Sequence, residues 1–504
     1  MRAGHDLLRS ARVLVALWVL IAGASAGRAS AENVLVIVAD DLGVDVLQCY
    51  GEGSTFPPTP TIDTFCENGI LFRNAWSNPV CSTSRATIQT GRYSFRTGVG
   101  DFSQQAPLSF SEFIIPEALD LNPELGYAHA AIGKWHLSNN ENGGPDGPNL
   151  SGYSHFSGSL YSLFDYSVWP KVENGEAFDT DVYPTTDNVN EAIEWINARG
   201  DEPWFLWLAF NAPHSPLHAP PDELHSYDLS DDPTTLELFQ AMVEAVDTEV
   251  ARLLGSMAPN VLEKTNIIFL GDNGTAGPPT QPPFDPDHGK ATLYEGGINV
   301  PLIFSGPQVV APGRESPALV NTTDLFATAL ELMGVDVQAS LPPSAGLDSR
   351  SLVPILHDEP FEPRAFVYAE LFREAEPSAN HGQAIRNEAG YKLIRYILGP
   401  EQMYDLNADP FEATDLLLAG LNPDQQAHYD ELSFHLDTIT HSACPGDANS
   451  DGTVDPLDSG YVLARLGCPV GAGNSRCDAA DQNHDGQVNP LDAGYVLARL
   501  GACP

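Results

Sequence analysis

Five short apolar runs constrain the fold of this chain more than any other feature. They span residues 33–39, 128–132, 205–210, 267–270 and 302–304, and each has the length and composition of a buried strand. Residues 187–199 and 236–254 lie between runs and have the apolar spacing of amphipathic helices. Strands that alternate with helices predict an α/β domain in which helices cover a mainly parallel sheet.

Polar residues that can bind metal or transfer protons follow four of these runs. The carboxyl ends of parallel strands share one edge of a sheet, where open α/β folds bind ligands. We therefore expect one crevice that holds a divalent cation on oxygen ligands and presents ammonium and imidazole groups to an anionic substrate. The residues are Asp40, Asp41, Lys134, His136, His214, Asp272 and Asn273. The alternatives are a helix N-cap for the aspartate pair, surface positions for Lys134 and His136, and a simple turn at Asp272-Asn273-Gly274.

A helix start is predicted at Cys81. Ser82, Thr83 and Ser84 are residue types that cap helix N-termini, and Gly91 suits the C-terminal cap. Cys81 would then lie at the positive end of the helix, where a thiolate or a bound anion is favoured. The alternative is a structural cysteine, buried or disulfide-bonded.

The seven cysteines form two groups and one remaining residue. Cys49 and Cys66 could pair across the first loop, and four more in the C-terminal tail allow three pairings. An odd number leaves one cysteine unpaired or modified, and Cys81 is the natural candidate. Export would permit the disulfides, because residues 1–31 have the basic start, apolar centre and Ala-Ser-Ala cleavage sites of a secretory signal peptide.

The charge balance is strongly acidic, with 68 acidic against 24 basic residues and a formal net charge of −44. This argues against nucleic acid as a partner, because phosphate binding needs basic stripes. Any site for an anionic substrate must be positive locally. No apolar run after the signal is long enough to cross a bilayer, so we expect a protein that is secreted, periplasmic or at the cell surface.

The sequence changes in character after about residue 380. Residues 391–394 and 402–406 resemble short antiparallel strands, 407–410 form a turn, and 425–438 predict a helix. A smaller sheet that packs on the first domain is therefore expected.

The tail contains two copies of a calcium-loop pattern. Residues 447–458 and 481–492 match each other, and the same Gly-Tyr-Val-Leu-Ala-Arg-Leu-Gly segment follows each copy. Oxygen-bearing side chains recur at the ligand positions, with glycine at the sharp turn in position 6. The candidate calcium ligands are Asp447, Asn449, Asp451, Thr453, Asp455 and Asp458, then Asp481, Asn483, Asp485, Gln487, Asn489 and Asp492. The alternative is an acidic, disordered tail.

Residues 33 to about 440 resemble the type I, formylglycine-dependent sulfatases of the alkaline-phosphatase-like superfamily. The matching motifs occur in the order of the family: Asp40-Asp41, Cys81-Ser-Thr-Ser-Arg85, Thr90-Gly-Arg92, Gly133-Lys-Trp-His-Leu137, Ala212-Pro-His-Ser-Pro216, Gly271-Asp-Asn-Gly274, Gly289–Gly297 and Tyr404-Asp-Leu. The tail resembles a type I dockerin, a calcium-folded module that binds cohesin domains.

The resemblance implies an α/β fold in which helices sandwich a mixed or parallel sheet, with a smaller antiparallel-sheet subdomain and an all-α calcium-binding tail. The expected boundaries are a signal peptide at 1–31, a catalytic domain at 32–380, its C-terminal subdomain at 381–441 and the dockerin-like module at 444–504.

The resemblance also implies a modified nucleophile. In the family, the cysteine at the position of Cys81 is oxidised to Cα-formylglycine by a formylglycine-generating enzyme. The hydrated aldehyde attacks sulfur through one oxygen, and its second hydroxyl later expels sulfate. Thr83 stands where the family normally has proline, sometimes alanine, in the segment that the maturing enzyme recognises.

The remaining roles are likewise implied by the motifs. Asp40, Asp41, Asp272, Asn273 and the modified Cys81 would bind one divalent cation, usually Ca²⁺. Arg85 would steady the modified side chain, while Lys134 and Lys290 would bind sulfate oxygens. His136 would help to deprotonate the diol, and His214 would act as general acid toward the leaving oxygen. His218 and His288 are candidates for the substrate rim.

The leading hypothesis is therefore an exported sulfuric ester hydrolase, similar to arylsulfatases, that acts on a sulfated glycan. The dockerin-like tail favours polysaccharide breakdown, with a cohesin-type scaffold protein or the cell surface as its attachment. One alternative is a phosphodiester or phosphonate hydrolase on the same scaffold. Another is a catalytically silent, calcium-dependent binding protein.

Overall fold

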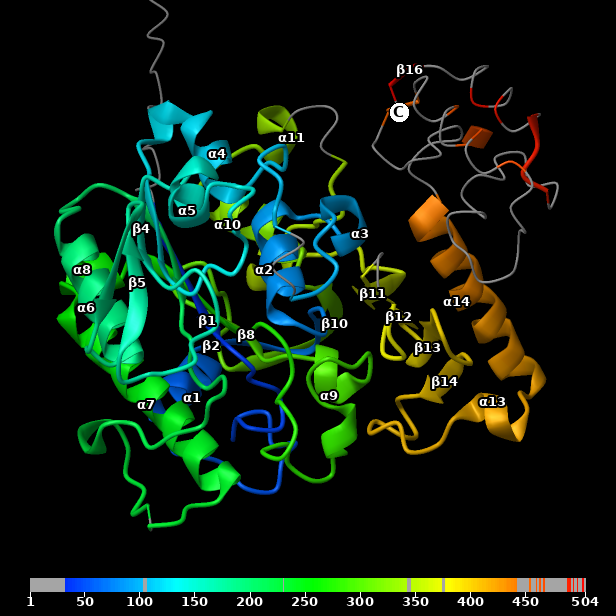
Figure 1. Ribbon diagram of the computed structural model, residues 1–504, viewed down its shortest axis with the longest axis horizontal. Helices are drawn as coiled ribbons and strands as arrows, with labels where there is room; N and C mark the ends of the chain where they lie inside the picture. Colours follow the sequence, from blue (N-terminus) through cyan, green and yellow to red (C-terminus); the bar gives the residue numbers. More distant parts are fainter. Residues whose placement is uncertain are drawn as a thin grey trace, which may run out of the picture.

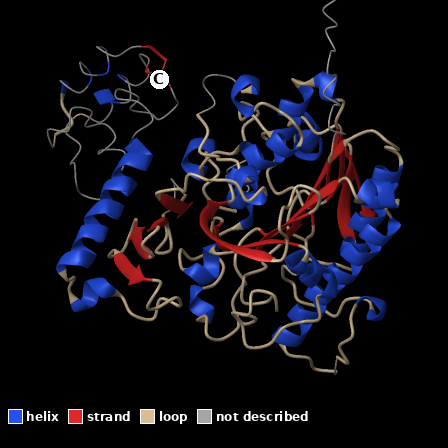
Figure 2. Ribbon diagram, turned by 180° about the vertical axis from the view of Figure 1, so that it is seen from behind, coloured by secondary structure: helices blue, strands red, loops and turns tan. Residues whose placement is uncertain are grey.

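The computed structural model describes residues 32–102, 107–229, 231–341, 346–373 and 377–441, and isolated residues of the tail between 453 and 502. The predicted signal peptide at 1–31 lies outside the described residues. Figures 1 and 2 show the molecule from opposite sides: a large twisted sheet lies between helices, and a smaller sheet lies beside it.

The large sheet has ten strands in the order β10-β2-β9-β8-β1-β7-β3-β4-β5-β6. At its centre β8, β1, β7 and β3 run parallel, as the apolar runs predicted. The fifth predicted strand, β9, joins the same sheet but is antiparallel to both neighbours. The bounds are β1 Asn33–Ala39, β2 Gly69–Trp76, β3 Ala128–Gly133, β4 His155–Gly158, β5 Trp169–Glu173, β6 Glu176–Thr180, β7 Trp204–Ala209, β8 Thr265–Gly271, β9 Leu302–Ser305 and β10 Arg314–Asn321.

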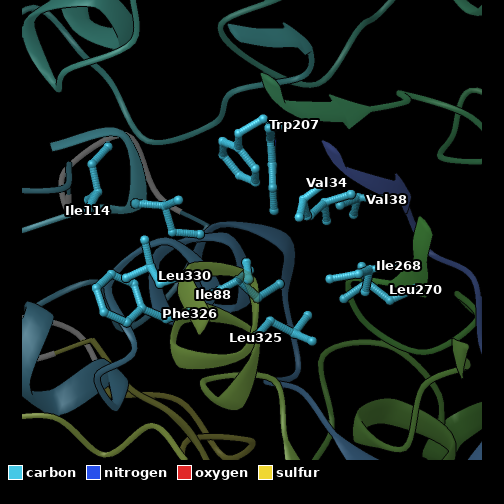
Figure 3. Packing of buried hydrophobic residues seen from close by; sticks show 14 of the residues in the cluster. Val34, Val38, Ile88, Ile114, Trp207, Ile268, Leu270, Leu325, Phe326 and Leu330 are labelled. Carbon is cyan, nitrogen blue, oxygen red and sulfur yellow. The ribbon is translucent and has the colours of Figure 1, made fainter. Parts of the chain in front are cut away.

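Alternate residues of β1 enter two different cores, because successive side chains of a strand point to opposite faces. Val34, Val36 and Val38 pack in the cluster that includes Ile88 of α2 and Phe326 of α10, which Figure 3 shows. Leu35 and Ile37 pack in the cluster formed with α1, α6 and α7 on the other face. Both faces of the central strand are therefore covered, which explains why its sequence is apolar throughout.

The helices match the predicted pattern and extend it. The stretch 187–199 overlaps α6, which ends at Asn197, and the stretch 236–254 lies in α7; the apolar faces of both helices cover one side of the sheet. The bounds are α1 Pro60–Glu67, α2 Cys81–Thr90, α3 Ser94–Thr97, α4 Ile115–Asp120, α5 Gly147–Leu150, α6 Pro184–Asn197, α7 Thr235–Ser256, α8 Pro259–Leu262, α9 Glu295–Ile298, α10 Asp324–Leu332, α11 Val337–Ser340, α12 Val353–Leu356, α13 Leu416–Ala419 and α14 Pro423–His441.

The predicted second sheet is present and fully antiparallel, in the order β11-β12-β13-β14. Its strands span Phe366–Leu371, Gly382–Asn387, Tyr391–Tyr396 and Gln402–Asp405. Leu432 and Leu436 of α14 pack on it, and Figure 1 shows this helix at the outer side of the small sheet. Because β11 belongs to it, the small sheet takes in residues ahead of the expected boundary at 381.

The helix that carries Cys81 begins as predicted, but its hydroxyl residues act differently. Val80 is the N-cap and has no side chain that could cap. Thr83 Oγ1 donates to the carbonyl of Val80 at 2.6 Å, and Ser84 Oγ donates to that of Asn78 at 3.1 Å. The hydroxyls therefore bind carbonyls of the incoming loop instead of the free N–H groups of the first turn. Gly91 is the C-cap in the left-handed conformation, φ 68°, as predicted.

Substitution of Gly91 by alanine is expected to destabilise the fold by about 2–4 kcal/mol, from the left-handed backbone and from overpacking. A Cβ atom at Gly91 would lie 2.9 Å from ring atoms of Phe326. Gly98, the C-cap of α3, is a matched control, because it has φ 75° but no atom within 4 Å of its added Cβ. Gly98→Ala should cost only about 1–2 kcal/mol. Urea unfolding of both variants measures the difference, and equal losses would contradict the packing contribution.

Of the cysteines in the described residues, two form a disulfide and one is free. Cys49 and Cys66 form the predicted disulfide, with Cα atoms 6.4 Å apart, and Cys81 is a free, buried cysteine. In the tail, β15 Thr453–Val454 pairs with β16 Gly501–Ala502. Most of the predicted calcium ligands lie outside the described residues: Asp447, Asn449, Asp451, Asp455, Asp458, Asp481, Asn483, Asp485 and Asp492. No helix within the described part of the chain is long and apolar enough to cross a membrane.

Candidate active site

The four polar strand ends meet at one edge of the large sheet. β1 lies between β8 and β7, and β3 adjoins β7, so the ends of all four are neighbours. The register aligns Ala39 with Gly271 and Gly133 with Ala209, each at or near the last residue of its strand. The polar residues that follow these four strands therefore lie close together at this edge of the sheet, as the sequence pattern predicted.

The aspartates and the asparagine form a buried, connected group. Asp272 Oδ1 accepts a hydrogen bond from the backbone N–H of Asp41 at 3.1 Å, and Asn273 Nδ2 donates to Asp41 Oδ1 at 2.8 Å. Asp41 has φ 68°, a left-handed conformation that is costly for a residue other than glycine. The chain accepts this strain immediately after β1, where both Asp40 and Asp41 are turned into the site.

Cys81 lies at the centre of this group. Its Sγ atom is 3.1 Å from Asp40 Oδ1 and 3.9 Å from Asp41 Oδ1, and Lys290 Nζ lies 3.4 Å away. Burial, and next the charge of Asp40, raise the pKa of the Cys81 thiol. The expectation that the helix start would favour a thiolate is therefore wrong, because burial and Asp40 outweigh the helix dipole and the lysines.

Three cationic side chains balance the three carboxylates. Lys134 Nζ donates to Asp40 Oδ2, and Lys290 Nζ donates to Asp41 Oδ1 at 2.5 Å. Arg85 donates to Asp272 Oδ2 through Nε at 3.0 Å and Nη2 at 2.8 Å. Burial alone would raise the pKa of Asp40, but Lys134 and the neighbouring cations hold it well below its usual value.

The two predicted histidines lie beside this group of charged residues. His214 Nε2 is 3.9 Å from Asp41 Oδ2 and 3.5 Å from Ser162 Oγ. His136 has φ 60°, and its buried Nδ1 has no hydrogen-bond partner within the described chain. Burial, then Lys134 and Arg85, lower the pKa of His136 well below its usual value, which favours a neutral imidazole.

The residues present fit a divalent cation. Donor atoms of Asp40, Asp41, Cys81 and His214 all lie within 4.8 Å of one another. Asn273 Oδ1 is buried without a hydrogen-bond partner in the described residues, which is costly unless another group binds it. Carboxylate and amide oxygens are the ligands that Ca²⁺ and Mg²⁺ prefer.

Tyr166 supports the site but carries no sequence signal that would have identified it. Tyr166 OH donates to the carbonyls of Asn211 at 2.8 Å and His214 at 2.9 Å, and so fixes the loop that carries the histidine. Arg85 Nη1 donates to the carbonyl of Lys134 at 2.6 Å. Of the two rim candidates, His218 bonds Tyr183 OH at 3.1 Å. His288 stacks on Tyr294 with 3.5 Å between ring centroids.

Asp45 anchors the loop that follows Asn273. Its carboxylate accepts from Thr275 Oγ1 at 2.7 Å and from the N–H of Gln281 at 2.7 Å, and burial raises its pKa to about 6. The Asp45 carboxyl therefore binds a proton more tightly in the folded protein than in the unfolded chain. The free energy of unfolding should be largest below the ordinary pKa and should fall as the pH rises to about 6.

Asp45→Asn should remove the contribution of Asp45 to this decline in the free energy of unfolding. That contribution is roughly 3 kcal/mol between a pH below the ordinary aspartate pKa and a pH above the raised pKa of Asp45. The variant also loses one hydrogen bond, but this loss is nearly independent of pH. Urea unfolding of wild type and variant at pH 4 and pH 6.5 isolates the Asp45 contribution as the difference between the two changes. Equal pH dependence in the two proteins would contradict it.

Family models match almost the whole described chain. The model described as Sulfatase matches residues 32–335, and that described as N-sulphoglucosamine sulphohydrolase, C-terminal, matches 287–438. The Dockerin type I domain model matches 445–501.

Curated relatives and solved structures agree with these matches. N-acetylgalactosamine-6-sulfatase from Homo sapiens is 30% identical over 374 residues, which cover 66% of this chain and 67% of the relative. The structure of Ps i-CgsB in complex with k-i-k-neocarrahexaose superposes with a TM-score of 0.68 at 25% identity, over 81% of this chain and 92% of that chain. The PsFucS1 sulfatase from Pseudoalteromonas sp. has the same fold, with a TM-score of 0.63 at 24% identity over 81% of this chain and 90% of that one. With the strand-end site in place, the matches show that the chain belongs to the sulfatase family, as a sulfatase that carries a dockerin type I module toward its C-terminal end.

Proposed function

We propose that this sulfatase is an exported enzyme that removes sulfate from a sulfated polysaccharide or oligosaccharide, with a nucleophile derived from Cys81. The position of Cys81 carries the proposal: its buried Sγ lies between Asp40 and Lys290 at the edge where four strand ends meet. The N-acetylgalactosamine-6-sulfatases among the relatives, and the neocarrahexaose bound by a similar structure, support a glycan substrate.

Conversion of Cys81 to formylglycine would remove a chemical difficulty. The raised pKa of the buried thiol keeps the unmodified side chain protonated, and a protonated thiol is a poor nucleophile. A hydrated aldehyde there supplies one hydroxyl that attacks sulfur and a second whose deprotonation expels sulfate. Lys290, which lies beside this side chain, would favour the deprotonated form of the attacking hydroxyl.

Asp40, Asp41, Asp272 and Asn273, with the modified Cys81, would hold one divalent cation, for which we propose Ca²⁺. When bound, the cation polarises the nucleophile and the sulfate oxygens. The chain supplies three carboxylates and three permanent cations here, so a divalent ion makes the site net positive. That local positive charge is what an anionic ester requires in a protein whose formal net charge is −44.

The remaining roles follow from charge and access. Lys134 and Lys290 would bind sulfate oxygens, while Arg85 holds Asp272 and the Lys134 backbone in place. The neutral imidazole that burial favours at His136 is the form that can accept a proton. We assign the general acid to His214, whose side chain is 17% exposed and so can reach a leaving oxygen at the mouth of the site. Burial lowers its pKa, but Asp41 and Asp40 act in the opposite direction.

We propose the division of the chain as follows. The catalytic domain begins at residue 32 and ends before β11, the small sheet and α14 form the C-terminal subdomain to residue 441, and the dockerin module spans 444–504. The duplicated calcium loops would each bind one Ca²⁺. A cohesin-type partner or a cell-surface attachment is the proposed role of this module, and it supports export through the predicted signal at 1–31.

Sulfate release from defined glycans tests the proposal. The full-length protein, produced in a host that converts motif cysteines, should release sulfate from at least one of κ-carrageenan, chondroitin 6-sulfate and heparan sulfate oligosaccharides, and Cys81→Ala should release none. Matched phosphate esters should react more slowly. Mass spectrometry of the peptide that contains Cys81 should show the thiol replaced by an aldehyde. Equal release by the alanine variant, or an unmodified thiol in active protein, would contradict the proposal.

A further inference from the structure

A cavity of about 500 Å³ lies beside the loop that carries His214, and apart from the rim position predicted for His218 it is used by none of the roles assigned above. The loop between β4 and β5 forms one wall through Phe164 and Tyr166, and the segment that follows β7 forms the other through Pro216 and His218. This volume is typical of a site for a small molecule or one unit of a larger ligand.

The first wall of this cavity is continuous with the active site. Ser162 Oγ lies 3.5 Å from His214 Nε2, the atom that faces Asp41. Tyr166 OH binds the carbonyl of His214. Phe164 lies between these two residues, and the spacing of successive Cα atoms keeps its Cα within roughly 7.6 Å of that of Ser162. A ligand that extends beyond His214 into the cavity can therefore also contact Phe164, which lines it.

The walls are largely apolar and include several aromatic rings. The side chain of Phe164 is 95% exposed, although it stands among buried neighbours such as Leu163 and Tyr166. The rings of Tyr166 and His218 lie 4.2 Å apart, and His218 is held further by Tyr183 OH. Aromatic faces of this kind can bury the apolar C–H face of a sugar ring.

The carboxylates that line the cavity give it a negative charge. Asp165, Asp181 and Asp222 line it, and none of the described lining residues is lysine or arginine. Hydrogen bonds from Ser167 lower the pKa of Asp165, which keeps it ionised. Carboxylates accept hydrogen bonds from sugar hydroxyls, but they repel sulfate and uronate groups. These aspartates do not form a metal-binding group, because among the described residues that arrangement occurs only in the active site.

We infer that this cavity binds an uncharged sugar unit adjacent to the sulfated one. The inference rests on the proposed function: a general acid must reach the leaving oxygen, so the sugar that bears the sulfate lies against His214. The glycan chain then extends over Phe164 into a cavity that stacks on its next ring and accepts its hydroxyls. The enzyme therefore selects sulfated glycans whose neighbouring unit has neither sulfate nor carboxylate.

Two matched substrates test the charge selectivity. Oligosaccharides of κ-carrageenan have a neutral unit beside the sulfated galactose, whereas those of ι-carrageenan have a sulfated unit there. Chondroitin 6-sulfate oligosaccharides place a uronate in the same relation. We expect kcat/KM to be at least about tenfold higher for the neutral neighbour, which corresponds to one favourable contact. Equal rates on the κ and ι substrates, or a preference for the charged neighbours, would overturn the inference.

Two variants test the walls of the cavity. Phe164→Ala should lower kcat/KM about tenfold on the oligosaccharide and leave 4-nitrophenyl sulfate unaffected, because the small ester does not reach the ring. Asp181→Asn combined with Asp222→Asn should raise the rate on the charged-neighbour substrate relative to the neutral one. Phe434→Ala is the matched control: its ring is 63% exposed on α14, at the opposite side of the molecule from β4 and β5 in Figure 1. Equal losses of Phe164→Ala on both substrates would count against the site.

A binding measurement separates this inference from the proposed function. Calorimetry with neoagarohexaose and cellohexaose, which carry no sulfate, needs no turnover. Binding to wild type that is lost in Phe164→Ala supports the cavity even if no sulfate is released from any glycan, a result that would defeat the proposed function alone. If neither neutral hexasaccharide binds wild type, the inference fails.

Discussion

Replacement of Cys81 by serine is expected to lower the rate of sulfate release by about 10⁴-fold or more, the order found when a hydrolase loses its nucleophile. A serine oxygen at this position lies near the same lysines, but it carries no second hydroxyl whose deprotonation could expel sulfate. It also cannot be converted to the aldehyde by the route that oxidises a cysteine. Initial rates of sulfate release from the preferred glycan, for wild type and Cys81→Ser, measure the loss.

The fold should not suffer, because serine is close to cysteine in size and the position is buried in a polar group. Thermal unfolding of the variant is therefore expected to match wild type within a few degrees, on the scale that about 1 kcal/mol shifts a midpoint. A serine variant with a normal midpoint and near-normal activity would show that the reaction does not pass through a modified Cys81.

Lys290→Met is expected to lower kcat by about 10²–10³-fold, the cost of removing one preorganised stabilising group from a transition state. Lys290 Nζ touches both Cys81 Sγ and Asp41, so its charge faces the proposed nucleophile and would also face the substrate oxygens that gain charge. Burial alone would lower its pKa, but Asp41 and Cys81 raise it, so the group stays charged over the working pH range. Its loss should therefore reduce the rate at every pH in that range.

Lys264→Met is the control. Lys264 directly precedes β8, at the opposite end of that strand from Asp272, and Asn33 N–H donates to its backbone carbonyl, a bond that the substitution keeps. This variant should keep the wild-type kcat. Steady-state kinetics of both variants on one substrate give the comparison. A small loss for Lys290→Met, equal to that of the control, would show that the lysine does not act on the transition state.

The sequence predicted the part of the fold that depends on continuous apolar runs. β1, β7 and β8 are covered on both faces, so burial alone determines their composition. The position of Asp40 and of Asp272 at adjacent strand ends then follows from parallel pairing.

Other features depend on contacts between distant segments and could not be predicted. β9 is antiparallel to its partners β2 and β8, and an apolar run in the sequence does not indicate in which direction a strand will pair. The hydroxyls of Thr83 and Ser84 are a local exception: they bind carbonyls three and six residues earlier, an alternative to capping that the sequence leaves open. The support of His214 by Ser162 and Tyr166 joins residues about fifty positions apart.

The burial of Cys81 would set a time limit on the proposed conversion to formylglycine. The side chain is 1% exposed in the folded protein, and Lys290, which helps to enclose it, follows 209 residues later in the chain. Synthesis at about 5–20 residues per second leaves roughly 10–40 s between the appearance of the two residues. An enzyme that made the proposed conversion would therefore have to act on the growing chain within that interval, and conditions that speed folding relative to modification would leave a permanently inactive fraction.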